Sequence, residues 1–124
     1  MRVPILKQGH YLVASIQDAL TDEDLAQLRQ ELVERVGQHR TRGVIIDVAA
    51  LDVMDSFVSR TLRDLAQTIK LRGAATVVVG LQPDVAFAMV RLGLSLAGAE
   101  TALDLEDGLA LLDRRTQQGN RGDR

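Results

Sequence analysis

The stretch Gly43-Val-Ile-Ile-Asp47-Val48, followed by Asp52-Val-Met-Asp55-Ser56-Phe-Val-Ser59-Arg60, decides the fold. The apolar run in the first stretch has no polar break, as is typical of a strand covered on both faces. The second stretch opens a helix near Asp55, and its inward face repeats at helical spacing. That face carries Val58, Leu62, Leu65 and Ile69. A buried strand, a loop and an amphipathic helix predict a parallel crossover unit, and functional loops of such sheets gather at the carboxyl ends of strands. We therefore expect residues 49–56 to form the functional region.

The rest of the chain alternates strand and helix signals. Further strands are expected at Ile5-Leu6, Tyr11–Ile16, Thr76–Val79 and Thr101–Leu103, with Gln8-Gly9-His10 joining the first two as a hairpin. Further helices are expected after Thr21, which forms a capping box with Asp24, from Pro83, and after the cap Asp104. Gly37, Gly73 and Gly93 are the expected helix ends. The third helix should turn Val85, Met89 and Leu92 inward, and the last one Leu105, Leu109 and Leu112.

This pattern predicts an α/β fold with one mixed, mostly parallel sheet of about four or five strands and about four helices packed against it. The domain should span residues 1–115. The polar, glycine-bearing tail 116–124 is expected to be disordered. The apolar connection around Leu94 and Leu96 is interpreted as core closure, with a dimer contact as the alternative.

Composition excludes several classes of function. The 124 residues are 46% hydrophobic, enough for a core, but only 2% aromatic, which disfavours base-stacking proteins. The net charge is −2 and the basic residues are scattered, so we expect no nucleic-acid partner. There is no cysteine for a disulfide or a thiolate site. No segment approaches the roughly 18 apolar residues of a membrane span, and we expect a cytoplasmic protein.

Ser56 is the main candidate residue, and two interpretations of it are open. It can serve as a helix cap that contributes about 1 kcal/mol to stability. It can also be a phosphoacceptor, because a phosphate at a helix N-terminus meets free N–H groups and the positive end of the dipole. Ser59 is the secondary candidate, although its hydroxyl is expected to bond back to the helical backbone. Thr61 is also nearby.

Enzymatic alternatives rest on Asp47, Asp52 and Asp55, which could bind magnesium or form a phosphoaspartate site. The only lysines, Lys7 and Lys70, are in the wrong places for the second design. The chain has no nucleophile elbow, no P-loop and no dinucleotide fingerprint. The histidines, His10 and His39, lie in turn-like surroundings without an evident acidic partner. We predict no catalytic activity, no metal and no cofactor.

The element order, the pair Asp55-Ser56 opening the second helix, and Gly80-Leu-Gln-Pro-Asp84 before the third resemble a STAS domain. The usual motif of the anti-anti-sigma factors in that family is Asp-Ser-Ser/Thr-Gly-Leu, from which this chain departs at Phe57 and Val58. Three further stretches resemble stressosome STAS proteins of the RsbS type. They are Val3-Pro-Ile-Leu-Lys7, Ser15-Ile-Gln17 and Glu100-Thr-Ala-Leu-Asp-Leu-Glu106, and the resemblance covers about residues 3–113.

The resemblance implies a non-catalytic signalling scaffold that sequesters an RsbT-type serine kinase and releases it when Ser56 is phosphorylated. It implies co-assembly with RsbR-type STAS proteins in a homo-oligomer or a large hetero-assembly, and resetting by an RsbX-type phosphatase. The expected partner-binding residues are Asp52, Asp55, Ser56, Phe57, Ser59 and Arg60. The alternative is an anti-anti-sigma factor regulated by phosphorylation of the same serine.

Overall fold

The computed structural model describes the backbone of residues 3–122 and the side chains of residues 3–116. In chain order the elements are β1 (Ile5–Gln8), β2 (Tyr11–Ser15), α1 (Asp22–His39), β3 (Gly43–Asp47), α2 (Ser56–Leu71), β4 (Ala75–Val79), α3 (Pro83–Leu92), β5 (Glu100–Ala102) and α4 (Leu105–Gly122). Within the described residues, five strands form one sheet in the order β1-β2-β3-β4-β5. The β1–β2 hairpin is antiparallel and the other neighbouring pairs are parallel. The predicted α/β fold with a mixed sheet is confirmed.

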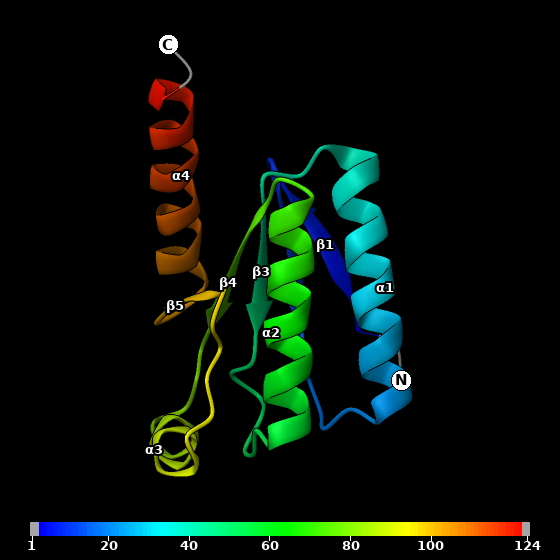
Figure 1. Cartoon of the computed structure of the whole chain (residues 1–124), viewed down its shortest axis with the longest axis vertical. Helices are drawn as coiled ribbons and strands as arrows, with labels where there is room; N and C mark the ends of the chain where they lie inside the picture. The colour runs from blue at the N-terminus through cyan, green and yellow to red at the C-terminus, as the bar shows by residue number, and fades with distance from the viewer. Residues whose placement is uncertain (1–2, 123–124) are drawn as a thin grey trace.

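Two helical layers cover the sheet, as Figure 1 shows. Successive right-handed crossovers between neighbouring strands place their helices on one side, so α1 and α2 lie together over one face. Helix α4 follows the last strand and covers the opposite face. Alternation along β3 follows these layers, because Val44 and Ile46 pack toward α1 and α2 while Ile45 packs toward α4. The strand is buried on both faces, as its unbroken apolar run predicted.

The parallel register brings the functional end of the sheet together. Asp47, the last residue of β3, is paired with Ser15 of β2 on one side and with Val79 of β4 on the other. The loop after β3 therefore emerges between the loops that follow β2 and β4. Helix α3 also lies at this end of the sheet, as Figure 1 shows.

Two helix caps confirm sequence predictions. Thr21 and Asp24 form a complete capping box at the start of α1. Asp104 accepts a hydrogen bond from the Asp107 N–H at 2.9 Å, at the start of α4.

Gly37 was the wrong choice for the end of α1, which continues to His39 and ends at Arg40 in the left-handed region. A Cβ at Gly37 would meet the guanidinium of Arg72, the far end of a flexible side chain that can shift, so packing does not require a glycine there.

Two predictions near the third and fourth helices need correction. Leu92 does not face inward: it is 70% exposed, because α3 buries only Val85 and Met89 before the turn at Gly93. The following Leu94 packs against the core instead, with Leu96, so the core-closure interpretation of this connection is confirmed.

Helix α4 continues through Gly122, beyond the expected limit of ordered structure at residue 115. Its continuation is compatible with good helix formers such as arginine and glutamine and with the absence of proline. The domain boundary at residues 115–116 stays a prediction.

Candidate phosphorylation and partner-binding loop

The loop after β3, residues 48–55, is anchored to the sheet and to the core. The Val48 N–H donates to the Val79 carbonyl oxygen at 3.0 Å, which extends the sheet pairing into the loop. Leu51 and Met54 bury their side chains in the core cluster under α2. Between these two anchors, Asp52 and Val53 face solvent. Burial of Leu51 and Met54 on either side of two exposed residues holds the loop in one shape while its polar rim stays accessible.

A second support comes from the segment between β4 and α3. The side-chain amide of Gln82 donates to the Ala49 carbonyl oxygen at 2.7 Å and, more weakly, to Asp52 Oδ1 at 3.4 Å. Gly80 has a φ of +83°, and a Cβ there would lie 2.9 Å from the Ala49 Cβ. Only a residue without a side chain allows this close approach without strain. The motif Gly80-Leu-Gln that contributed to the family resemblance therefore supports the loop physically.

Asp55, rather than Ser56, caps α2. Asp55 has extended backbone, and its Oδ1 accepts a hydrogen bond from the Val58 N–H at 2.8 Å. Ser56 is the first helical residue and is exposed. The capping interpretation of Ser56 is therefore wrong at this position, because its neighbour performs that task. The Ser56 hydroxyl remains at the helix entrance, where the N–H groups of the first turn favour an anion.

Ser59 differs from Ser56 in its surroundings. Its side chain is 1% exposed, and its hydroxyl has no hydrogen-bond partner in the part of the chain that the structure describes. The expected bond from Ser59 back to the helical backbone is absent there; Thr61 makes that kind of bond, donating to the Phe57 carbonyl oxygen at 2.9 Å. A kinase cannot reach Ser59 in this conformation. The assignment of Ser59 as a secondary phosphoacceptor and as a partner-binding residue is therefore corrected.

The three aspartates of the enzymatic alternative serve separate structural hydrogen bonds. Asp47 Oδ1 accepts from the Ala49 N–H at 2.9 Å, while Asp52 accepts from Gln82 and Asp55 caps α2. Among residues 3–116, no three acidic, histidine or cysteine side chains form a group that could hold a metal ion. The loop carboxylates therefore shape a surface and fix a helix start.

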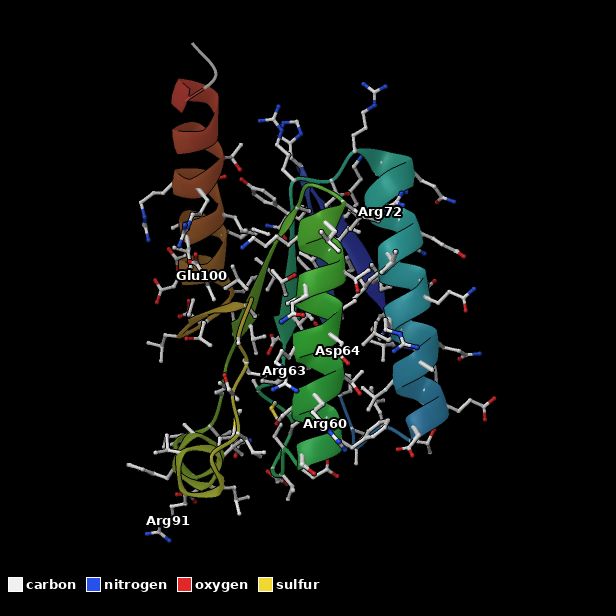
Figure 2. All side chains as sticks on the ribbon, viewed as in Figure 1. Arg60, Arg63, Asp64, Arg72, Arg91 and Glu100 are labelled. Atoms are coloured by element: carbon white, nitrogen blue, oxygen red, sulfur yellow. The ribbon has the colours of Figure 1, made fainter. Side chains whose placement is uncertain are left out.

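The rim around Ser56 combines charge and apolar surface. Arg60 lies one turn into α2, and its Nε donates to the Ser56 carbonyl oxygen at 3.3 Å, so its guanidinium lies near the helix entrance (Figure 2). Phe57 is 36% exposed and Val53 is 73% exposed. Sequence reasoning identified Phe57 but missed Val53, and no local pattern marks that loop valine as exposed. Apolar groups beside a polar rim are typical of a protein-binding surface.

The fold and this loop define the class of protein. The STAS domain family model matches residues 2–107, and the chain belongs to the STAS domain family. In the part that the structure describes, no helix combines the length and the apolar character that crossing a membrane requires.

Within that family, the similarity is to stressosome proteins. A serine-to-glutamate variant of RsbS from Moorella thermoacetica superposes with a TM-score of 0.80 at 36% sequence identity, covering 93% of this chain and 97% of that one. A chain in a structure describing the molecular architecture of the stressosome gives a TM-score of 0.77 at 37% identity, covering 91% and 98%. The similarity to RsbS predicted from the sequence is confirmed.

Curated relatives include the RsbT co-antagonist protein RsbRA of Bacillus subtilis, which is 26% identical over 97 residues. That match covers 78% of this chain and 35% of RsbRA, so the chain spans about a third of the length of that relative. The anti-sigma factor antagonist SpoIIAA in its unphosphorylated form shares the fold at 13% identity and a TM-score of 0.67. The chain is thus homologous to RsbR co-antagonists and shares its fold with the anti-sigma factor antagonists.

Proposed function

We propose that this protein is a non-catalytic, cytoplasmic signalling scaffold that sequesters an RsbT-type serine kinase and releases it when Ser56 is phosphorylated. The observation that carries this proposal is the division of roles at the start of α2. Asp55 caps the helix, which leaves the Ser56 hydroxyl exposed and without a structural task there. The similarity to RsbS across almost the whole chain supports the same function.

The switch is electrostatic. A phosphate adds about −1.5 to −2 charges at neutral pH. The helix N-terminus and the guanidinium of Arg60 favour that charge within this chain, while Asp52 and Asp55 oppose it. The fold therefore tolerates the modification. A partner carboxylate about 5 Å away, at an effective dielectric constant near 20, is repelled by roughly 3 kcal/mol per unit charge before screening. Half of that repulsion weakens binding by about tenfold.

The kinase-binding surface in this proposal is the rim of the loop and the first turn of α2. It consists of Asp52, Val53, Asp55, Ser56, Phe57 and Arg60. Val53 and Phe57 supply apolar contact, and the charged residues around them determine which partner fits. Co-assembly with RsbR-type STAS proteins and resetting by an RsbX-type phosphatase complete the cycle. The homology to RsbRA supports the first of these partners.

Phosphate mapping after incubation with an RsbT-type kinase and ATP tests the site. We expect phosphate on Ser56 and none on the Ser56→Ala variant. Thr61 is the matched control, because it is a half-buried hydroxyl on the next turn of the same helix and already donates to the Phe57 carbonyl oxygen. The Thr61→Ala variant should be labelled like the wild type. Labelling that persists in Ser56→Ala overturns the site assignment.

Kinase capture tests the function separately from the site. Immobilised wild-type protein should retain the kinase, and Ser56→Asp should retain at least about tenfold less. A matched substitution, Gln67→Asp, adds the same charge to an exposed position farther along α2 and should retain the kinase normally. Equal retention by all three proteins contradicts the phosphorylation-gated release. The alternative anti-anti-sigma function shares this serine, and the solved structures that support it share the fold at only 10–13% identity.

A further inference from the structure

A hollow opens at the start of β4, at the end of the sheet opposite to the loop after β3. Its volume is about 610 Å³, which is within the range of small-molecule sites. Small or apolar residues form part of its lining, namely Ala74, Ala75 and Leu112. Within the described residues, the pairing of β5 with β4 begins only at Val77. The edge of β4 at Ala75 and Thr76 is therefore not covered by β5, and the hollow lies there.

The lining of this hollow carries a net positive charge. Three cationic side chains line it: Arg42 before β3, Lys70 in the last turn of α2, and Arg115 on α4. Arg115 forms an ion pair with Glu100, which also lines the hollow. No ion pair of Arg42 or Lys70 is found within the described residues. These two cations are therefore available to an anion from solution.

A second hollow adjoins the first and adds to the positive charge. It shares Arg42 and Gly73 with the first and is also lined by Arg40 and Arg72. Figure 2 shows Arg72 at this end of α2. Several cations gathered at one end of a chain with a net charge of −2 produce a local field that attracts small anions. The helix dipole accounts for Lys70, which lies in the last turn of α2, but not for Arg42, which precedes a strand.

Thr76, which also lines the hollow, is the second and independent sign of a ligand. Thr76 is 2% exposed, and its Oγ1 has no hydrogen-bond partner in the part of the chain that the structure describes. A buried hydroxyl without a partner lowers stability. The next three residues of β4 are valines, which have the same shape without that cost. The hydroxyl at this position therefore calls for a partner outside the folded chain.

We propose that this hollow binds a small organic molecule that carries a phosphate group. Such a group has three acceptor oxygens and close to two negative charges at neutral pH. The guanidinium of Arg42 and the ammonium of Lys70 bind these oxygens, and Thr76 donates its hydroxyl after rotation about χ1. Space beside Gly73, where an added Cβ meets nothing within 4 Å, accommodates the rest of the molecule.

The ligand in this proposal is smaller than a nucleotide and is bound far from Ser56. No aromatic side chain is among the described residues that line the hollow, so a nucleobase has no stacking partner there. Helix α2 has 16 residues, which corresponds to a length of about 24 Å between the two ends. A ligand at Lys70 therefore leaves the surface around Ser56 free, and the site goes beyond the proposed kinase switch.

NMR titration of the isotope-labelled full chain with glycerol phosphate tests the site. We expect amide shifts centred on residues 74–76 and on Gly98, with a dissociation constant of about 1 mM or below at low salt. Inorganic phosphate, which lacks the organic part, and succinate, a dianion without phosphate, should each bind at least about threefold more weakly. Equal binding of either probe, or shifts spread over exposed cations throughout the chain, overturns the proposal.

Matched substitutions separate ligand binding from folding. Thr76→Val removes the hydroxyl and keeps the shape, so the dissociation constant should rise by about fivefold or more while the urea midpoint stays equal or rises. Thr76→Ser keeps the hydroxyl and should bind within about threefold of wild type. Arg42→Gln and Lys70→Gln should each weaken binding by about tenfold, whereas Arg29→Gln, an exposed change on α1, should leave it unchanged.

The outcome for Thr76 is decisive. Wild-type affinity in Thr76→Val, or equal weakening by Arg29→Gln and Arg42→Gln, would mean that probes are attracted only by surface charge, and the proposal would be overturned. Ser56→Ala should bind glycerol phosphate like the wild type. A failure of kinase capture therefore leaves this site standing.

Discussion

At the scale of single residues, Asp55 and Ser56 divide stability and function between neighbouring positions. Asp55 satisfies a backbone N–H at the start of α2, whereas the Ser56 side chain faces solvent. We expect Asp55→Ala to lower the free energy of unfolding by about 1 kcal/mol and Ser56→Ala to change it by less than about 0.5 kcal/mol. Urea denaturation measures both values. Asp55→Asn keeps a capping oxygen and should retain most of the stability; equal losses in the two alanine variants would contradict the assigned cap.

Ser59 gives the opposite response to an introduced charge. Ser56→Asp places a carboxylate at the exposed helix entrance, where the dipole is favourable, and stability should remain within about 1 kcal/mol of wild type. Ser59→Asp buries a carboxylate in a site that is 1% exposed, and it should cost about 3 kcal/mol or prevent folding. Ser59→Ala removes an unpaired buried hydroxyl and should leave stability equal or slightly higher. Thermal unfolding of these three variants distinguishes the two serines, and a stable Ser59→Asp protein would show that Ser59 is accessible.

At the scale of elements, the site depends on the close approach of Gly80 to the loop after β3. Gly80 and Gly73 both have positive φ, of 83° and 91°, so an alanine at either position is strained by about 1–2 kcal/mol. A Cβ at Gly73 meets nothing within 4 Å, whereas a Cβ at Gly80 lies 2.9 Å from the Ala49 Cβ. Gly80→Ala should therefore destabilise more than Gly73→Ala and also slow phosphorylation of Ser56 by displacing the loop. Urea midpoints and initial labelling rates provide the comparison; equal effects in both would mean that the contact with Ala49 does not position the site.

Local sequence rules predicted the elements well where a cap or an apolar period acts within one element. The capping box of Thr21 and the buried run Val44–Ile46 are examples. The rules failed at two places. Gly37 indicated a helix end, yet α1 continues to His39 and Arg40 takes the left-handed position that ends it. Leu92 matched an inward period, yet α3 contacts the core through only two residues.

The loop that carries the candidate site was predicted at its place in the fold, between β3 and α2, but its contacts were not. Its position follows from the loop after a buried parallel strand, which local patterns reveal. The burial of Ser59 was not expected, although it precedes Leu62 and Ala66 by three and seven residues and so shares their buried stripe. The hydrogen bond from Gln82 to Ala49 joins residues 33 positions apart, and no local pattern indicates it. Long-range contacts of this kind come from packing and therefore require the structure.

At the scale of the whole molecule, Tyr11 joins the two ends of the domain. Its hydroxyl donates to Asp113, so the first part of the sheet is tied to α4 across 102 positions of sequence. Burial, followed by this hydrogen bond, raises the pKa of Tyr11 above its ordinary value of 10.0. In the folded state the proton is thus held more tightly than in the unfolded chain. The contribution of this group to the free energy of unfolding is fully present below about pH 10, and it is lost as the pH rises through the pKa of the folded state.

We therefore expect the free energy of unfolding to fall as the pH rises above about 10, with a slope that Tyr11→Phe reduces. At neutral pH, Tyr11→Phe should itself cost about 0.5–1.5 kcal/mol, because the hydrogen bond to Asp113 is lost while water can solvate this exposed carboxylate. The chain has a single tyrosine and no tryptophan, so tyrosinate absorbance follows this one group directly. In the folded protein, the midpoint of the tyrosine ionisation should lie at a higher pH than in the urea-unfolded chain. Identical midpoints in the two states would mean that the contact between Tyr11 and α4 does not persist in solution. The wild type and Tyr11→Phe should then show the same dependence of the free energy of unfolding on pH.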